Sequence, residues 1–421
     1  MSDVEVVPAA AGTGAPPTLW RNRSFNLLWS SQLLSELGST MTALAFPLLV
    51  LALSGSPVRA GAVGTAGTVV RALVRLPAGV LVDRVNRRWA MLGCDAARLA
   101  GFALLGVLVL AGRATLVWIM VAAVVEAAGS AVFMTAERAA LRSVVALSQL
   151  SGAVARNEAR SAVASLAGPP LGGALFSLGH AVPFLGDALS YLLSMIGIGL
   201  IRTPMQQPRT RTRDSALAQV REGISFVLRQ PFLRAVLLIA APTNLAFAGM
   251  LFTVVVVLRQ HGTAPAVIGL VESIIGIGAL LGALAAPALT RRIPVRGLVL
   301  GICWAGTALM AVSSLLTRSI LVAVPVALAV ALAPACNAAL FGYQSAITPD
   351  RLQGRVISVV LLGATLLAGA APILAGVLIV AVGGPVTVLC CAGALALAAL
   401  TATLSRGIRT MRPAEELAAG A

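Results

Sequence analysis

Four charged residues lie inside long apolar stretches of the sequence, where charge is costly and usually has a purpose. They are Glu36, Arg71, Arg98 and Glu126. An ionised side chain at the centre of a bilayer costs at least about 2.5–3.5 kcal/mol, so it is functional or paired by default. Two carboxylates close to two guanidinium groups could load and release a proton, or bind a charged group of a ligand. The alternative is a static ion-pair network that only holds helices together.

The composition excludes a soluble protein. Of the 421 residues, 58% are hydrophobic and only 11% are charged, whereas soluble domains have about 45–50% apolar and about 25% charged residues. The chain contains no lysine, which excludes a Walker A nucleotide site and Schiff-base chemistry. Two histidines without an H-E-x-x-H motif are too few for a zinc enzyme. We therefore expect no metal, no cofactor and no enzyme activity.

Twelve apolar segments must position these charges, and each is near the ~20 residues that cross a bilayer as a helix. They fall at about residues 26–53, 58–81, 89–111, 115–135, 156–178, 183–201, 233–258, 266–289, 297–316, 320–342, 356–381 and 385–404. The four charges then lie about 10–12 residues into their helices from one common side, or roughly 15–18 Å deep. Four charges at one depth suggest a single site in the N-terminal half.

Other charges in the apolar segments are weaker candidates. Asp95 precedes Arg98 by three residues, so the two could pair on one helix face. Asp187 and Glu272 lie near the opposite ends of their helices. They offer less than the four charges near mid-depth.

The arginines predict the orientation. With the N-terminus in the cytoplasm, 24 of the 31 arginines fall in cytoplasmic segments, four in external loops and three inside helices. This alternation is the positive-inside pattern of a multi-pass membrane protein. The net charge of +16 is therefore a topology signal rather than a sign of nucleic-acid binding. A lysine-free chain rich in Ala, Gly, Val and Arg fits a GC-rich bacterium, so we expect a bacterial cytoplasmic membrane with both termini cytoplasmic.

The longest break between apolar segments divides the chain into two sets of six helices. The predicted organisation is a disordered cytoplasmic tail at 1–22, an N-terminal six-helix bundle at 23–201, a cytoplasmic linker at 202–232, a C-terminal six-helix bundle at 233–405 and a cytoplasmic tail at 406–421. Within the linker, one helical face carries Leu217, Val220, Ile224, Val227 and Leu228. This pattern predicts an amphipathic helix on the inner membrane surface; the alternative is a plain tether.

A charged motif follows the second predicted helix. Its residues are Gly79, Asp83, Arg84, Arg87 and Arg88. The segment resembles the cytoplasmic signature of the major facilitator superfamily, G-x-x-x-D-R-x-G-R-R, with Asn86 at the second glycine. Asn tolerates a left-handed backbone better than most residues.

This resemblance implies a gate between two helix bundles. Asp83 would face the start of helix 11, near Gly354 and Arg355, where a carboxylate meets the positive end of the helix dipole. Arg84, Arg87 and Arg88 would complete the gate, and Arg138 or Arg142 could pair with the same carboxylate. The alternative is that the arginines only fix topology.

A second motif lies in the fifth predicted helix. Gly168, Pro169, Gly172 and Gly173 belong to a G-P-x-x-G-G segment that resembles the element typical of exporting antiporters. Two earlier glycines of the fuller pattern are replaced here by Ala155 and Ala164. Glycines permit close helix approach and prolines bend the helix, so we expect a hinge against the opposite bundle or plain close packing. Residues 31–53 and 157–176 also resemble the macrolide-efflux and enterobactin-exporter branch of multidrug efflux permeases.

The resemblance covers about residues 20–405. It implies an all-α integral membrane protein of the major facilitator fold, with twelve transmembrane helices in two pseudo-symmetric six-helix bundles around a cavity that opens alternately to each side. The expected function is proton-coupled export of an amphipathic small molecule, such as an antibiotic, toxin or siderophore. Glu36 and Glu126 would carry protons, while Arg71 and Arg98 would tune them or meet an anionic group of the substrate.

Three alternatives remain open. Sodium could replace the proton, since carboxylates bind both. The same fold could serve uptake of a nutrient. From a different class, the chain could be the membrane subunit of an ATP-driven transporter. In each case the expected partners are a small molecule and the lipid bilayer, with no nucleic acid, and a monomer is expected.

Overall fold

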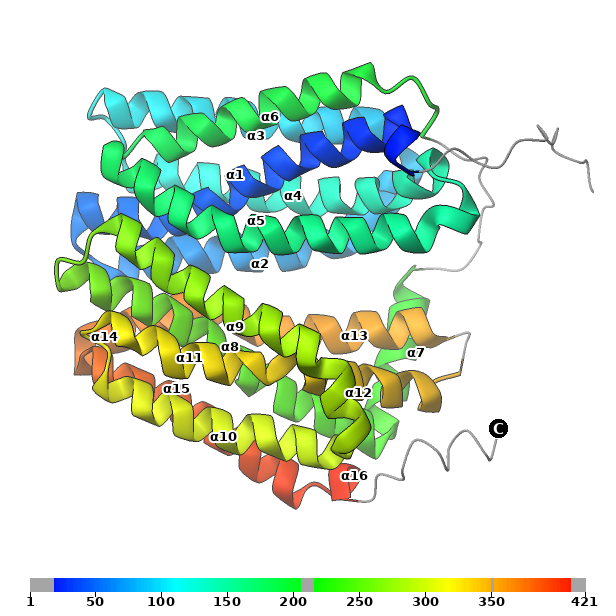
Figure 1. Ribbon diagram of the computed structural model, residues 1–421, viewed down its shortest axis with the longest axis vertical. Coiled ribbons are helices and arrows are strands. Elements are labelled where there is room, and N and C mark those ends of the chain that lie inside the picture. The colour runs from blue at the N-terminus through cyan, green and yellow to red at the C-terminus, as the bar shows by residue number, and fades with distance from the viewer. Residues whose placement is uncertain (1–18, 206–215, 350–351, 410–421) are drawn as a thin grey trace, which may run out of the picture.

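The computed structural model describes residues 19–205, 216–349 and 352–409, without the side chains of residues 76, 216–220 and 406. Within these residues every regular element is a helix. Six long helices form the first half of the chain: α1 (Arg23–Ser54), α2 (Pro57–Arg84), α3 (Arg87–Leu110), α4 (Leu116–Val144), α5 (Leu150–Leu178) and α6 (Val182–Leu200). They pack as one bundle, the upper layer of Figure 1.

The second half forms the lower layer of Figure 1. Its long helices are α8 (Pro231–Gln260), α9 (Pro265–Arg292), α10 (Val295–Leu315), α11 (Ala323–Ala331), α12 (Ala333–Ile347), α13 (Gln353–Leu366), α14 (Ala371–Val382) and α15 (Gly384–Leu404). Short 3-10 turns at Ile320–Val322 and Leu367–Ala370 join on to α11 and α14. The fold prediction is thereby confirmed as an all-helical membrane architecture.

Eleven helices of the described chain are long and apolar enough to span a membrane. A twelfth span is α2, whose parts Pro57–Arg75 and Pro77–Arg84 are bent by 53° at a break before Pro77. Two spans are each built from two helices, α11 with α12 and α13 with α14. Prolines near the start of α12 and α14, Pro334 and Pro372, lack the N–H that would continue the preceding helix.

Sequence signals set the helix ends. Asn22 accepts a hydrogen bond from the Phe25 N–H at 3.0 Å and so begins α1, and Gly55, at φ +62°, ends it. Asn86 accepts from the Arg88 N–H at 3.0 Å and begins α3. Its φ of −67° means that the left-handed backbone expected at this position is not used. Asn86 replaces the usual glycine of the motif as a helix cap.

The hydropathy-based helix ends are wrong for α4 and α5. The fourth helix runs to Val144 rather than 135, and the fifth begins at Leu150 rather than 156. Polar residues at these ends lower the hydropathy but keep helical geometry. Glu137 therefore lies within α4 on a buried surface, although the apolar pattern ends the fourth span before it. Arg160, inside the predicted fifth span, is also buried.

Odd- and even-numbered spans alternate in direction, so one end of the molecule collects most of the described arginines of the loops and helix termini. We call it the arginine-rich end; it includes the start of α1, the end of α2 and the start of α3. In Figure 1 this is the right-hand side, where α7 (Ala216–Arg229) also lies. The opposite end is called the far end.

The two halves meet at the far end through α5 with α9 and α2 with α14. A methyl group on Gly173 or on Gly269 would overlap backbone of the partner helix, at Pro265 and Pro169 respectively. Gly61 on α2 and Gly376 on α14 are equally close to the backbone opposite them. Four glycines thus let the backbones touch, and we call this region the far-end contact.

The contact does not continue to the arginine-rich end. Its last hydrogen bond along α5 and α9 joins the Ser273 hydroxyl to the Leu166 carbonyl at 2.7 Å. Beyond it, Ala155 and Val163 on α5 and Leu281 and Leu284 on α9 are exposed. The halves are therefore joined at the far end and separated at the arginine-rich end.

The segment between the halves contains helix α7, as its periodicity predicts. Val227 is buried and Gly223 lies against the backbone of Arg355 on α13, while Ile224 and Leu228 are exposed. The helix therefore packs on the C-terminal half rather than resting only on a membrane surface. The predicted contributions of Leu217 and Val220 lie outside the described side chains.

The predicted tails are only partly within the described residues. Leu19–Arg21 forms a short 3-10 helix and Arg406–Arg409 a short α16, whose Ile408 is fully buried. Both segments are ordered, where the sequence predicts tails. Residues 1–18 and 410–421 lie outside the described chain.

Candidate functional site

One guanidinium group is shared by two carboxylates in the N-terminal half. Arg160 Nε on α5 lies 3.0 Å from Glu36 Oε2 on α1, and Arg160 Nη1 lies 2.8 Å from Glu137 Oε1 on α4. The side chains of Arg160 and Glu137 are 7% and 8% exposed, whereas that of Glu36 is 30% exposed. We call these three residues the carboxylate triad. With both carboxylates ionised it carries one net negative charge.

The position of Arg160 follows from the packing of α5. Arg160, Ala164, Gly168 and Gly172 recur every four residues and are all buried, so they form one stripe along the helix. This stripe packs on α1, where Thr40 Oγ1 donates to the Ala164 carbonyl at 3.0 Å. About 15 Å into its helix, Arg160 is therefore directed at α1 and α4 and not at solvent.

A polar cavity of about 130 Å³ lies beside the triad. Its lining includes Glu36, Glu137 and Arg160, together with the serines 35, 130 and 161. Glu158 and Arg138 also line it and are themselves exposed. The triad is thus next to a space of suitable polarity for water.

A second ion pair joins α2 to α4. Arg71 Nη2 lies 2.6 Å from Glu126 Oε2. The Arg71 side chain is 52% exposed at the middle of a membrane-spanning helix, while that of Glu126 is 10% exposed. A charged group half exposed at this depth faces a water-filled space and not hydrocarbon.

Arg98 has a third environment. It donates to Asp95 on the same helix, as the spacing predicts, and Asp95 also accepts from Ser194 on α6 at 2.7 Å. The guanidinium group lies over the rings of Phe133 and Tyr191, 5.0 and 4.4 Å from their centroids. This buried arrangement ties α3, α4 and α6 together.

The four charges of the sequence-based site are therefore not brought into one cluster. Glu126 and Arg71 pair with each other, Glu36 pairs with Arg160, and Arg98 pairs with Asp95. Equal depth does not fix which way a side chain points around its helix, and that direction separates them. Arg160 and Glu137 are the residues that the sequence-based site lacks.

The two weaker candidates differ from each other. Asp187 is fully buried and accepts hydrogen bonds from Thr42 at 2.9 Å, Ser190 at 2.9 Å and Tyr191 at 3.3 Å. These bonds satisfy it within the bundle. Glu272 on α9 has no hydrogen bond or ion pair with another described residue. Among the described residues no group of three His, Cys, Asp or Glu could hold a metal.

The residues of the motif after α2 have two different environments: the arginines at the start of α3 are hydrogen-bonded to neighbouring helices, and the charged residues at the end of α2 are exposed. Arg87 Nη1 donates to the carbonyls of Ala139 and Met205 at 3.1 and 3.0 Å, and Arg88 donates to that of Gly199. These bonds join the start of α3 to the ends of α4 and α6. They hold the N-terminal half together at its arginine-rich end.

Asp83 and Arg84 are exposed, and the space beside Gly79 is open. No hydrogen bond or ion pair joins Asp83 to its expected partners at the start of α13, Gly354 and Arg355, all of which are described. Gly354 is exposed, and Arg355 forms an ion pair with Glu222 on α7.

The motif in α5 has two packing roles. Gly168 and Gly172 are buried against Thr40 and Met41 of α1. Gly173 and Pro169 instead belong to the far-end contact with α9. One segment therefore touches both its own half and the opposite half, which agrees with a hinge as well as with close packing.

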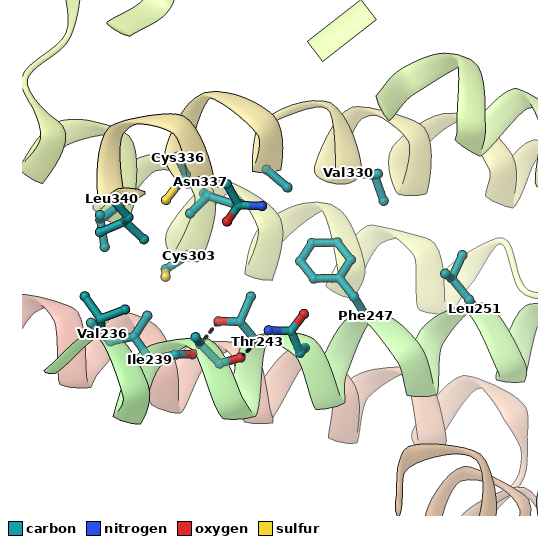
Figure 2. Close-up of a pocket in the computed structure, with 15 residues that line it drawn as sticks. Val236, Ile239, Thr243, Phe247, Leu251, Cys303, Val330, Cys336, Asn337 and Leu340 are labelled. Atoms are coloured by element: carbon teal, nitrogen blue, oxygen red, sulfur yellow. Dashed lines mark hydrogen bonds between the residues drawn. The ribbon is translucent and has the colours of Figure 1, made fainter. Parts of the chain in front are cut away.

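The C-terminal half contains a cavity of different character (Figure 2). It has a volume of about 250 Å³ and lies between α8, α10, α11 and α12. Its wall consists of Val236, Ile239, Ala240, Thr243, Asn244, Phe247, Leu251, Val299, Ile302, Cys303, Val330, Ala333, Cys336, Asn337 and Leu340. None of these side chains is charged. We call it the apolar pocket.

A family model described as a transmembrane secretion effector matches residues 13–419. The chain belongs to this family of the major facilitator superfamily. It is a multi-pass membrane transporter that carries small molecules, and its relatives are transporters and not enzymes. The sequence-based family assignment is confirmed.

Two curated relatives are efflux proteins. The multidrug efflux pump Tap of Mycolicibacterium fortuitum is 27% identical over 346 residues, which cover 79% of this transporter and 83% of Tap. Macrolide efflux protein A of Streptococcus pyogenes is 23% identical, over 62% of this transporter and 65% of that protein. Both are similar to this transporter over much of its length.

Solved structures confirm the fold. A bacterial homologue of the human lysosomal transporter Spinster, in an inward-facing and unoccupied conformation, superposes with a TM-score of 0.73 at 17% identity, over 94% of this transporter and 98% of that chain. The nucleoside transporter NupG gives a TM-score of 0.73 at 11% identity, over 91% and 100% of the two chains.

Proposed function

We propose that this transporter exports an amphipathic small molecule from a bacterial cell in exchange for protons, with the carboxylate triad as the proton-exchange site. The observation that carries the proposal is the sharing of Arg160 by Glu36 and Glu137. The efflux activity named for two relatives, Tap and macrolide efflux protein A, supports the direction of transport.

Charge balance supports the triad as the proton site. One guanidinium cannot neutralise two carboxylates, so the ionised triad keeps a negative charge inside the membrane, which favours uptake of one proton. Glu36 is the more exposed carboxylate, and it alone bridges α1 to Arg160. A proton on Glu36 would remove its ion pair with Arg160 and so loosen α1 from α5.

The Arg71–Glu126 pair is not proposed as a proton-exchange site. Its charges cancel one to one, so it has less reason to take up a proton. Because Arg71 is half exposed, it would instead contact water or a polar group of the substrate in the space between the halves. Arg98, buried by its contacts with Asp95 and Tyr191, would support the fold of the N-terminal half.

The orientation follows from the arginines. Placing the arginine-rich end in the cytoplasm satisfies the positive-inside rule and puts both termini there. The conformation would then be inward-facing, with the far-end contact closing the external side. Substrate would enter from the cytoplasm or inner leaflet, and the gate at Asp83 would close after loading.

The proposal can be tested in inverted membrane vesicles that hold an internal acid pH reported by a quenched dye. A panel of lipophilic cations, macrolides, catechol siderophores and neutral aromatic compounds is added in sodium-free buffer. Dequenching by at least one compound, absent from vesicles without the transporter, is the expected result. Export that occurs only with sodium, or only with ATP when the gradient is collapsed, would contradict proton antiport.

A further inference from the structure

The two halves of the molecule have cavities of opposite chemistry. The polar cavity beside the triad is lined by glutamates and arginines. The apolar pocket in the C-terminal half has no charged side chain in its wall. Of these two cavities, only the one in the N-terminal half is therefore lined by charged side chains.

The apolar pocket is open on one side, and that side is polar. Asn244 on α8 and Asn337 on α12 line it and are exposed near the middle of their spans. An exposed amide at this depth is unfavourable in hydrocarbon, so these two side chains face water in the space between the halves. The mouth of the pocket thus opens to the substrate path and not to lipid.

The inner wall is well suited to an aromatic or branched aliphatic group. Phe247 and Thr243 project from α8 towards α11 and α12, and Cys303, Val330 and Cys336 approach from the other side (Figure 2). Thr243 uses its hydroxyl on the Ile239 carbonyl at 2.7 Å, so it presents mainly its methyl group.

The amides at the mouth have hydrogen-bonding capacity to spare. Asn244 donates to the Ala240 carbonyl at 2.8 Å, which leaves its side-chain oxygen available. Asn337 makes no hydrogen bond to another described residue. An apolar interior with a few polar groups at its mouth is the usual design of a small-molecule site.

We propose that the apolar pocket is the substrate-binding subsite of this exporter and that it takes the uncharged aromatic or aliphatic part of the substrate. Asn337 and Asn244 bind a neutral polar group at its edge. This inference rests on the proposed function, because a molecule bound in the pocket is a substrate only if the protein exports it. Binding to the pocket is tested separately from transport. Its volume of about 250 Å³ is below the 300–1,000 Å³ of whole drug sites, so it holds part of a larger molecule.

Charge selectivity follows from the wall. A charged group would lose its hydration inside the pocket without gaining an opposite charge, which is strongly unfavourable. Neutral ring systems should therefore bind in the pocket, and analogues that carry a charge on the ring should not. A charge on a flexible arm would remain outside the pocket, in water.

The test uses two probes that differ by one charge. N-phenyl-1-naphthylamine is a neutral fluorophore, and 8-anilinonaphthalene-1-sulfonate is the same ring system with a sulfonate. Each is titrated into the purified transporter in nanodiscs, and partition into lipid is removed by subtracting empty nanodiscs. Ala240→Phe fills the pocket, and Ala308→Phe, on the exposed side of α10, is the matched control.

The expected result is saturable binding of the neutral probe to the parent and to Ala308→Phe, weakened about tenfold or more in Ala240→Phe, which corresponds to about 1.4 kcal/mol. The sulfonate should show no saturable binding that depends on Ala240. Equal neutral-probe affinity in Ala240→Phe and Ala308→Phe would overturn the proposal, as would sulfonate binding that Ala240→Phe abolishes.

A gain-of-function variant guards against misfolding of Ala240→Phe. Asn337→Asp places a negative charge at the mouth, so it should weaken the neutral probe and strengthen a cationic analogue with a trimethylammonium arm. No change for either probe would contradict the pocket. Binding is measured without a proton gradient, so failure of proton antiport in vesicles would remove the proposed function and leave the pocket result intact.

Discussion

Arg160 on α5 donates from Nε to Glu36 on α1 at 3.0 Å, across 124 positions of sequence. The same guanidinium donates to Glu137 on α4 at 2.8 Å. Three helices of the N-terminal half therefore meet at one cation. Any change in the charge of Glu36 alters how α1 is held to α5, and α5 is one of the two helices of this half that form the far-end contact.

Removing the cation should destabilise the N-terminal half. Arg160→Gln leaves the buried Glu137 carboxylate without its partner, and loss of one member of a buried pair costs about 3–5 kcal/mol. Thermal unfolding in detergent should show a clearly lower midpoint. Arg138→Gln, an exposed arginine beside the same cavity, should change the stability by less than about 0.5 kcal/mol. Equal midpoints for the two variants would show that the triad is not a structural ion pair.

Restoring the charge balance should recover part of the loss. The double variant Arg160→Gln with Glu137→Gln removes the unpaired carboxylate, so its midpoint should lie above that of Arg160→Gln alone. If the two residues do not interact, the effects of the two substitutions on the free energy of unfolding will simply add. A double variant less stable than Arg160→Gln by the amount that Glu137→Gln alone costs would therefore contradict the pairing.

Enlarging a glycine of the far-end contact should shift the conformational equilibrium. Gly173→Val cannot fit against the Pro265 backbone, so the closed far end becomes unfavourable and the conformation closed at the arginine-rich end becomes populated. Nitroxide labels at Leu81→Cys and Ser358→Cys, on an otherwise cysteine-free chain, should show a shorter distance by pulsed electron paramagnetic resonance.

The control for this shift is Gly393→Val, because Gly393 is exposed on α15 with open space beside it. Its label distances should match those of the parent. An unchanged distance distribution in Gly173→Val would mean that the far-end contact does not determine the conformation.

The charges at the arginine-rich end should act in opposite directions on that same distance. Glu222 on α7 pairs with Arg355 on α13 in the present conformation, so Glu222→Gln should release Arg355 and favour closure. Asp83→Asn should disfavour closure, because it removes the carboxylate that would face α13 in the proposed closed gate. A partly exposed ion pair contributes about 0.2–1 kcal/mol, so a population change of roughly 1.4-fold to fivefold is expected. If both variants shift the population of the closed conformation in the same direction, the proposed gate is contradicted.

Hydropathy and arginine placement were sufficient to predict the helices, because lipid imposes a length and a charge pattern on every span. The end of α4 was not predictable in this way, because Glu137 is polar and yet buried. A signal for Arg160 was available: the four-residue repeat through Ala164, Gly168 and Gly172 extends back to it. For Glu137 no comparable pattern exists, since its partner is 23 residues away on another helix.

The pairing of charges was also beyond the sequence. Glu36 and Glu126 lie at similar depth, but rotation around their helix axes directs one to Arg160 and the other to Arg71. Asp95 with Arg98 was predictable because both lie on one helix three residues apart. Pairs within a helix follow from spacing, whereas pairs between helices need the packing.

The most direct test of the account compares proton release by four forms of the transporter in inverted vesicles: the parent, Glu36→Gln, Glu126→Gln and Glu158→Gln. Glu158 lines the same polar cavity as Glu36 but is exposed, so it is a matched control. We expect substrate-induced proton release to be lost in Glu36→Gln and retained in the other three forms. Full proton release by Glu36→Gln, at normal abundance in the membrane, would contradict the carboxylate triad as the proton-exchange site.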